Sequence, residues 1–185
     1  MITRAFLAFP LSDAAQIALG RMSEDIAVQY AGKGVRGVKE GNFHITLHFF
    51  GPLSEDEKIA ADEALNEACA KIHPFFIALG EIGGFPSLAS PKVVYCGLSA
   101  GVSEASAVRD AVALALERKG FHTEERQWTP HITLARMKPG ETRIVLGRGV
   151  GKGVRETISR IHLMRSDSTP FGPKYSAVSE YYFTL

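Results

Sequence analysis

The sequence predicts an α+β fold of two similar halves, a bilobal pseudo-two-fold duplication in which antiparallel sheets line a central cleft and helices pack outside. Three observations predict it. The order strand, helix, histidine-bearing strand occurs twice. The tetrapeptide His-Ile-Thr-Leu begins at His44 and again at His131. Phe6 and Tyr95 stand mid-strand at the start of the two units, separated by nearly the same distance as the motifs. Such internal repetition indicates a degenerate duplication, and we expect one domain over 1–185 made of two interleaved lobes.

The first half is expected to begin with a strand over 3–9. This aromatic and apolar run is typical of a strand and, because it stops at a proline, differs from a signal peptide. A helix follows over 14–30, where apolar residues recur at helical spacing. A loop rich in Gly and Lys over 32–41 then leads to a strand over 43–50. We expect the Gly-Pro pair at 51–52 to end that strand.

The remaining elements follow from the same kinds of signal. Ser54 and Glu57 match a capping box, which predicts the start of a helix that runs to about residue 72. Another helix is expected over 103–119, with apolar residues on one face. Runs of apolar and β-branched residues predict strands over 75–82, 92–98, 131–137, 157–166 and 175–185.

The composition is that of an ordinary globular domain. The chain has 185 residues, of which 45% are hydrophobic and 22% charged, and its net charge is +1. No apolar run reaches the roughly 18 residues that a membrane helix needs. Cys69 and Cys96 show no metal-ligand spacing, so we expect buried thiols in a reducing compartment. These features predict a cytoplasmic monomer that uses no cofactor and binds no membrane.

Positive charge is concentrated toward the C-terminal end of the sequence. Residues 136–165 contain eight Lys or Arg against only Glu141 and Glu156. This basic segment, with Arg148 and Lys152 near its middle, either attracts phosphates or is an ordinary solvated face. The alternating glycines within it do not match the phosphate-loop pattern, so a basic loop is the better interpretation.

The two His-Ile-Thr-Leu motifs carry the chemistry. Because side chains alternate along a strand, His44 and Thr46 share one face, and so do His131 and Thr133. An imidazole and a hydroxyl at this spacing can converge on one tetrahedral phosphate. A lone motif of this kind is more often a core histidine bonded to a carbonyl. Two copies in equivalent places of a duplicated unit favour a catalytic pair that faces a shared cleft.

Two histidines suffice for displacement at phosphorus. One imidazole must be neutral to accept a proton from water, and the other must be charged to protonate the departing oxygen; a pKa near 6.5 permits both states. The Thr hydroxyls would hold the non-bridging oxygens. No metal is expected, because His44 and His48 stand roughly 13 Å apart on a strand and cannot share an ion. The other histidines fit no motif; they are His73, His122 and His162.

With their flanking residues, the motifs resemble the two-histidine phosphoesterases, and within them the RNA 2′,3′-cyclic phosphodiesterases, also called 2′-5′ RNA ligases. The resemblance covers nearly the whole chain. His48 departs from the family, which usually carries a small residue there; by alternation it shares the face of His44 and lies along the same cleft. The matching segments are Arg4–Phe9, Asn42–Gly51, Gly84–Pro86, Pro130–Arg136, Ser166 and Gly172–Tyr175.

The resemblance implies hydrolysis of a 2′,3′-cyclic phosphate at an RNA end, with loss of the 3′ oxygen and formation of a 2′-phosphate. It implies that His44 is the general acid and His131 the general base. Arg136 is either a phosphate or base contact or a surface arginine, because strict alternation turns it away from the cleft unless the strand bulges just before it. Phe50 shares the first motif's face and either stacks on a nucleobase or packs in the core. Phe49 is expected in the core.

The expected partner is an RNA or a nucleotide that ends in a 2′,3′-cyclic phosphate, and reversible 2′-5′ ligation is a conceivable side reaction. A second interpretation keeps the site but changes the substrate to a cyclic nucleotide, an ADP-ribose cyclic phosphate or a 2′-5′ oligonucleotide. A third is an RNA-binding protein without turnover. Both intact His-Thr pairs count against the third, because binding alone needs no pair of proton-transfer groups.

Overall fold

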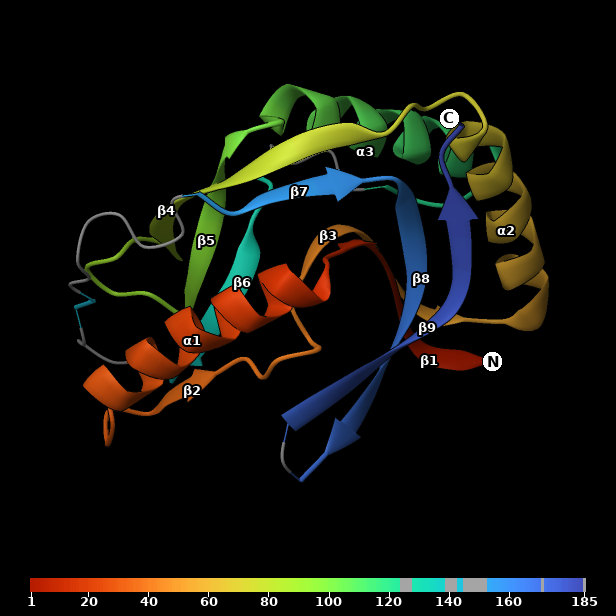
Figure 1. Cartoon of the computed structure of the whole chain (residues 1–185). Coiled ribbons are helices and arrows are strands. Elements are labelled where there is room, and N and C mark those ends of the chain that lie inside the picture. The colour runs from red at the N-terminus through yellow and green to blue at the C-terminus, as the bar shows by residue number, and fades with distance from the viewer. Residues whose placement is uncertain (124–127, 139–142, 145–152, 171, 185) are drawn as a thin grey trace.

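The computed structural model describes residues 1–123, 128–138, 143–144, 153–170 and 172–184. Within these ranges the chain forms three helices and nine strands (Figure 1). In chain order the elements are β1 (Ile2–Pro10), α1 (Asp13–Gln29), β2 (Val35–Gly37), β3 (His44–Leu53), α2 (Glu55–Cys69), β4 (Phe75–Phe85), β5 (Val93–Ala100), α3 (Val102–Arg118), β6 (Ile132–Met137), β7 (Arg155–Ile158), β8 (Arg160–Thr169) and β9 (Gly172–Tyr182).

The nine strands form one antiparallel sheet. Its order is β7-β4-β5-β6-β3-β1-β8-β9, and β2 pairs with the C-terminal part of β6. This order is symmetric about the junction of β6 and β3: β5 and β1 flank the central pair, β4 and β8 lie next, and β7 and β9 form the edges. The predicted α+β fold with two related halves is confirmed. The sheets expected in the two lobes are the halves of a single curled sheet (Figure 1).

The halves exchange strands with each other. β4 comes after the first motif in sequence but pairs with β5 of the second half, and β8 comes late but pairs with β1 of the first. The strand predicted over 157–166 is therefore two strands. The chain leaves the edge of β4 at Ile158 and starts β8 at Arg160. Apolar alternation continues through the crossing, so the sequence pattern does not reveal the change of partner.

Two further expectations about strands were wrong. The loop predicted over 32–41 contains β2, which at three residues is too short to give a periodic pattern. β3 passes through the Gly-Pro pair that was expected to end it and continues to Leu53. It does so because Gly51 adopts a φ of +75°, which glycine tolerates, and its pairing with β1 continues through Ala5.

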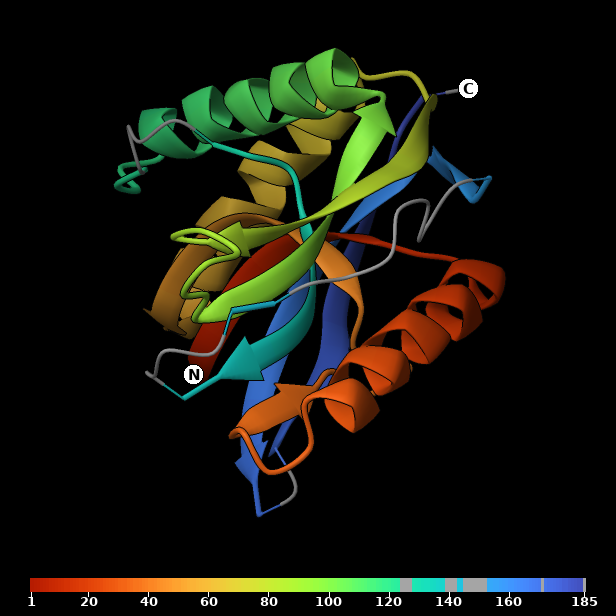
Figure 2. The same ribbon diagram turned by 90° about the vertical axis from the view of Figure 1, so that its left-hand side faces the viewer.

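The helices pack on one face of the sheet. The hydroxyl of Ser23 on α1 lies 2.8 Å from the carbonyl oxygens of Val38 and Leu134, which ties α1 to the β2–β6 region. α2 and α3 lie together over the other half of the sheet (Figures 1 and 2). The predicted capping box is confirmed, with reciprocal bonds between Ser54 and Glu57 at the start of α2.

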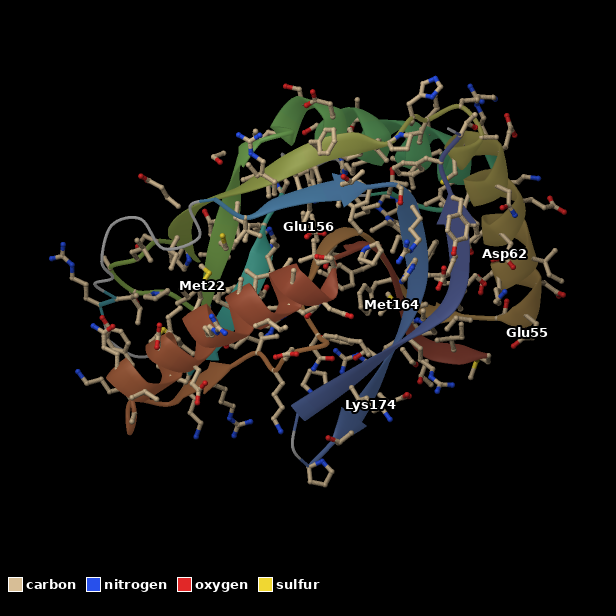
Figure 3. The ribbon with its side chains drawn as sticks, viewed as in Figure 1. Met22, Glu55, Asp62, Glu156, Met164 and Lys174 are labelled. Carbon is tan, nitrogen blue, oxygen red and sulfur yellow. The ribbon has the colours of Figure 1, made fainter. Side chains whose placement is uncertain are left out.

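The start of α1 is attached to β7 by a buried carboxylate. Ser12 caps α1, and the carboxylate of Glu156 accepts hydrogen bonds from the backbone N–H (3.0 Å) and the hydroxyl of Ser12 (Figure 3). These bonds satisfy an acidic side chain that is only 8% exposed.

The core lies between the helices and the sheet. Its largest fully buried side chains come from all parts of the chain, including Phe9, Leu65, Ile77 and Leu134. Cys69 and Cys96 are buried and free, as expected. Among the described helices, none has the length and apolar character needed to cross a membrane.

Candidate active site

The two His-Ile-Thr-Leu motifs meet at the centre of the sheet, where β3 and β6 pair through Ile45 and Ile132. One register step to either side of this pair, antiparallel geometry sets each histidine opposite the threonine of the other motif. Directly opposed residues share a face. The sheet therefore gathers both histidines and both threonines on the face that Ile45 and Ile132, which are fully buried, do not use.

Each histidine is anchored in the same way. His44 Nδ1–H donates to the carbonyl oxygen of Asn42 (2.8 Å), and His131 Nδ1–H donates to the carbonyl oxygen of Thr129 (2.7 Å). A carbonyl can only accept, so Nδ1 carries the hydrogen in both rings. This bond fixes the tautomer and leaves Nε2 of each ring to exchange a proton with a ligand.

Two aromatic rings flank His44. Phe6 of β1 lies 5.0 Å away between centroids, and Tyr175 of β9 lies 5.1 Å away with its ring edge-on. Tyr175 also contacts Phe6. These rings remove water from one side of the imidazole, and they come from strands at opposite ends of the sequence.

His131 has an equivalent pair. Phe85 lies 4.9 Å from it and Tyr95 5.3 Å, and the two aromatic rings stack on each other at 4.4 Å. Gly83 permits this stack, because a Cβ at that position would stand 2.3 Å from the Tyr95 ring. The two halves thus build similar aromatic walls from different residues.

Burial and nearby charge control protonation of both rings. The pKa of His44 is lowered from 6.5 to about 4, mainly by burial; the bond to Asn42 opposes this shift, and the charge of Arg136 and that of a protonated His131 contribute to it. Burial also lowers the pKa of His131, with a smaller contribution from Arg136 in the same direction. In the free protein at neutral pH, both imidazoles are therefore neutral.

A β-bulge in β3 overturns three expectations. Between Thr46 and His48, β3 advances two residues while β1 advances one, which shifts the alternation. Phe49, expected in the core, is 65% exposed and lies opposite Phe6 on the face that carries the histidines. Phe50, expected to share the first motif's face, packs against the core instead. His48, expected on the face of His44, also points to the other face, and its ring contacts Phe50 at 4.6 Å.

A matching bulge in β6 brings Arg136 to the face that carries the histidines. Between Thr133 and Ala135, β6 advances two residues while β5 advances one. Leu134 and Ala135 are both fully buried, and Arg136 is exposed on the opposite face. Its effect on the pKa of both histidines is consistent with that position. The residue five places after each histidine thus shares the face of the histidines: Phe49 in one half and Arg136 in the other.

Two residues outside the motifs hold the site together. The indole N–H of Trp128 donates to the carbonyl of Thr46 (3.1 Å), which connects the segment before the second motif to the first. The side-chain amide of Asn42 donates to the carbonyl of Pro173 (3.1 Å), so the residue that anchors His44 also holds the hairpin of β8 and β9. Both were missed from sequence, because neither bond follows a local spacing.

Only part of the basic segment belongs to the described residues. Arg148 and Lys152 lie outside them, and Arg155 is exposed at the start of β7. In the described ranges no three His, Cys, Asp or Glu side chains gather where they could hold a metal ion.

A curled antiparallel sheet whose two central strands each present a His-x-Thr motif is the architecture of the two-histidine phosphoesterase class. The chain belongs to the 2′-5′ RNA ligase superfamily, whose family model matches residues 18–170. It is 34% identical over 167 residues to the RNA 2′,3′-cyclic phosphodiesterase of Aeropyrum pernix, covering 88% of this chain and 93% of that protein. It is 29% identical over 187 residues to that of Aquifex aeolicus, covering 98% and 97%.

Solved structures share the fold. Escherichia coli LigT in complex with 3′-AMP superposes with a TM-score of 0.81 at 19% identity, covering 100% of both chains. A protein of Thermus thermophilus gives a TM-score of 0.81 at 23% identity, covering 97% of each chain. At these identities the likeness establishes the architecture.

Proposed function

We propose that this protein hydrolyses the 2′,3′-cyclic phosphate at an RNA end to a 2′-phosphomonoester, without a metal ion. The observation that carries the proposal is the paired anchoring of His44 and His131, each with Nδ1–H bonded to a carbonyl two residues upstream. This leaves two proton-transfer nitrogens on one face, beside two threonines. The names of the curated relatives support the same substrate.

In the proposed reaction one histidine takes a proton from water as the oxygen attacks phosphorus. The bond between phosphorus and the 3′ oxygen breaks, and the second histidine gives its proton to that oxygen. Thr46 and Thr133 donate hydrogen bonds to the non-bridging oxygens, and Arg136 balances the charge that develops there. A 5′-hydroxyl in place of water would form a 2′-5′ linkage by the same steps, which is the proposed ligation.

The two histidines are proposed to differ in role. The family resemblance assigns the acid to His44 and the base to His131. Burial favours the opposite, because the pKa of His44 falls to about 4, so this ring holds a proton less readily. The anionic phosphate favours the charged form of any imidazole beside it. The histidine that acts as the acid must therefore become protonated when the substrate binds. An experiment that varies the leaving group distinguishes the two assignments.

Phe49 is the proposed platform for the terminal nucleobase. Its ring is exposed, and it packs on Phe6 (5.7 Å), which in turn packs on His44. Stacking of this kind tolerates any base. This placement replaces Phe50, whose ring packs between His48 and Phe121.

The test is incubation with a short RNA that ends in a 2′,3′-cyclic phosphate, in the presence of EDTA, with the position of the product phosphate determined. The expected product is a 2′-phosphate, formed at full rate in chelator. A 3′-phosphate product, or activity that a divalent ion restores, would contradict the proposal. Binding without turnover would support the RNA-binding alternative, and turnover of only a cyclic nucleotide or a 2′-5′ oligonucleotide would support the change of substrate.

A further inference from the structure

Arg36 of β2 stands directly opposite Arg136 of β6 in the antiparallel pairing. This pairing was not expected from sequence, because the segment around Arg36 was predicted to be a loop. Opposed residues in such a pair have Cβ atoms about 4.5–5.5 Å apart and share a face of the sheet. Two arginines are therefore side by side at the end of β6 that lies away from its histidine.

The flanking residues of β2 establish which face Arg36 uses. Val35 packs against the core, and a Cβ at Gly37 would stand 2.7 Å from the hydroxyl of Ser23 on α1. Both therefore point toward α1 on the core side. Arg36, between them, points away from α1 and is exposed. That is the face of the sheet that carries the histidines, to which the bulge in β6 also turns Arg136.

This arginine pair brings two positive charges together. Like charges directly opposite each other across a sheet are destabilising. Among the described residues, neither arginine has a carboxylate within salt-bridge distance. Two guanidinium groups on the face that carries the histidines, with no carboxylate paired to them among the described residues, are suited to bind an anion.

We propose that Arg36 binds the internucleotide phosphate that precedes the terminal nucleotide of an RNA substrate. This inference rests on the proposed function and extends it from a cyclic phosphate to the chain that carries it. The charge of Arg136 acts on both histidines, and in the proposed reaction Arg136 contacts the terminal phosphate. β2 lies beside β6 (Figure 2) and places Arg36 directly opposite Arg136, so the anion within reach of Arg36 is the backbone phosphate next to the terminal one.

The experiment compares two substrates and two variants. The substrates are a mononucleoside 2′,3′-cyclic phosphate, which has no internucleotide phosphate, and a tetranucleotide with the same cyclic end. The variants are Arg36→Gln and the matched control Arg21→Gln, which removes an exposed arginine from α1. Arg36→Gln should lower kcat/KM for the tetranucleotide by about tenfold or more, as expected for loss of a charged hydrogen bond. It should change kcat/KM for the mononucleoside cyclic phosphate by less than about twofold. Arg21→Gln should leave kcat/KM for both substrates unchanged.

Salt and stability give two further readouts. The salt dependence of kcat/KM for the tetranucleotide should become shallower by about 0.7 in logarithmic slope, which corresponds to one phosphate contact on a single strand. The Tm of the free Arg36→Gln protein should be unchanged or higher, because a like-charge contact is removed. An equal loss on both substrates, or no loss on either, would overturn the inference.

A wild-type protein that hydrolyses neither substrate would refute the proposed function, but the role of Arg36 can still be tested by binding. Fluorescence anisotropy with a tetranucleotide that ends in a 2′-phosphate should show at least about tenfold weaker binding by Arg36→Gln than by wild type. A 2′-mononucleotide should bind both proteins alike. Equal tetranucleotide affinities would exclude the contact.

Discussion

The ring of Tyr175 stands edge-on to the imidazole of His44, at 5.1 Å between centroids and an interplanar angle of 89°. Tyr175 lies on the last strand, and the bond from Asn42 to Pro173 holds that strand near the first motif. This contact contributes to the burial that lowers the pKa of His44. Because β9 is an edge strand of the sheet, His44 reaches this degree of burial only when the sheet has folded.

Stability should fall as the pH is lowered from 6.5 to 4. In this window the unfolded chain protonates His44 but the folded protein does not, so acid favours unfolding. The loss attributable to His44 is on the order of 3 kcal/mol and is complete below about pH 4. Urea denaturation at a series of pH values should show a shallower decline for His44→Asn than for wild type.

His122 provides the control for that measurement, because it is an exposed histidine outside the site. His122→Asn should keep the wild-type dependence on pH. If His44→Asn gave the same slope as wild type, the imidazole of His44 would not be held neutral by its surroundings.

Loss of either motif histidine should nearly abolish hydrolysis. His44→Ala and His131→Ala should each lower kcat by roughly 10²–10⁴-fold, because each removes a proton-transfer group. Thr46→Ala and Thr133→Ala should cost less, since each removes one hydrogen bond while other contacts hold the phosphate. Steady-state kinetics on a cyclic phosphate, with His122→Ala as control, would measure this. Near-normal turnover by a folded histidine variant would remove the basis of the proposed mechanism.

The bulge in β3 predicts opposite effects for two adjacent phenylalanines. Phe49→Ala should lower kcat/KM for nucleotides by a factor that corresponds to the roughly 1–3 kcal/mol of free energy that one stacked base contributes. It should leave Tm nearly unchanged. Phe50→Ala should instead lower Tm, because it removes a ring that packs against the core. Phe76 on β4 is similarly exposed, at 71%, and Phe76→Ala should change neither quantity. If Phe50→Ala lowered kcat/KM and Phe49→Ala lowered Tm instead, β3 would follow simple strand alternation without the bulge.

A substrate with a better leaving group should distinguish the acid from the base. A p-nitrophenyl phosphodiester releases an anion that needs no proton, so loss of the general acid matters less. If the family assignment holds, His44→Ala will retain a larger fraction of its activity on this ester than His131→Ala. The burial of His44 favours the reverse order. Rates on the ester and on the cyclic phosphate, measured for both variants, decide between the assignments.

The sequence predicts the helices and strands of this fold better than it predicts which strands pair with each other. The helices and the capping box of Ser54 and Glu57 depend on local spacing, and the structure confirms them. The crossing between β7 and β8 is invisible locally, because the alternation continues while the neighbouring strand changes.

The candidate site follows a similar rule. His44 and Thr46 are recognisable because residues i and i+2 lie on the same face of a regular strand. Phe49 and Arg36 are not. A bulge depends on pairing with a distant strand, and β2 exists only because it joins β6. For residues more than two positions from each histidine, the face of the sheet could therefore be assigned only once the register of the strands was known.

The exchange of strands between the halves has a consequence for the route by which this protein folds. β1 cannot be flanked on both sides until β8 has been synthesised, since Ala5 pairs with Arg165. Pairings of such large sequence separation raise the contact order and slow folding. The half that contains β4 is complete only when β7 has emerged, and the half that contains β1 only when β8 and β9 have emerged, so the nascent chain exposes the open edges of β1 and β4 until these late strands are made. A fragment that ends before β7 would retain both motifs yet lack an outer partner for each half.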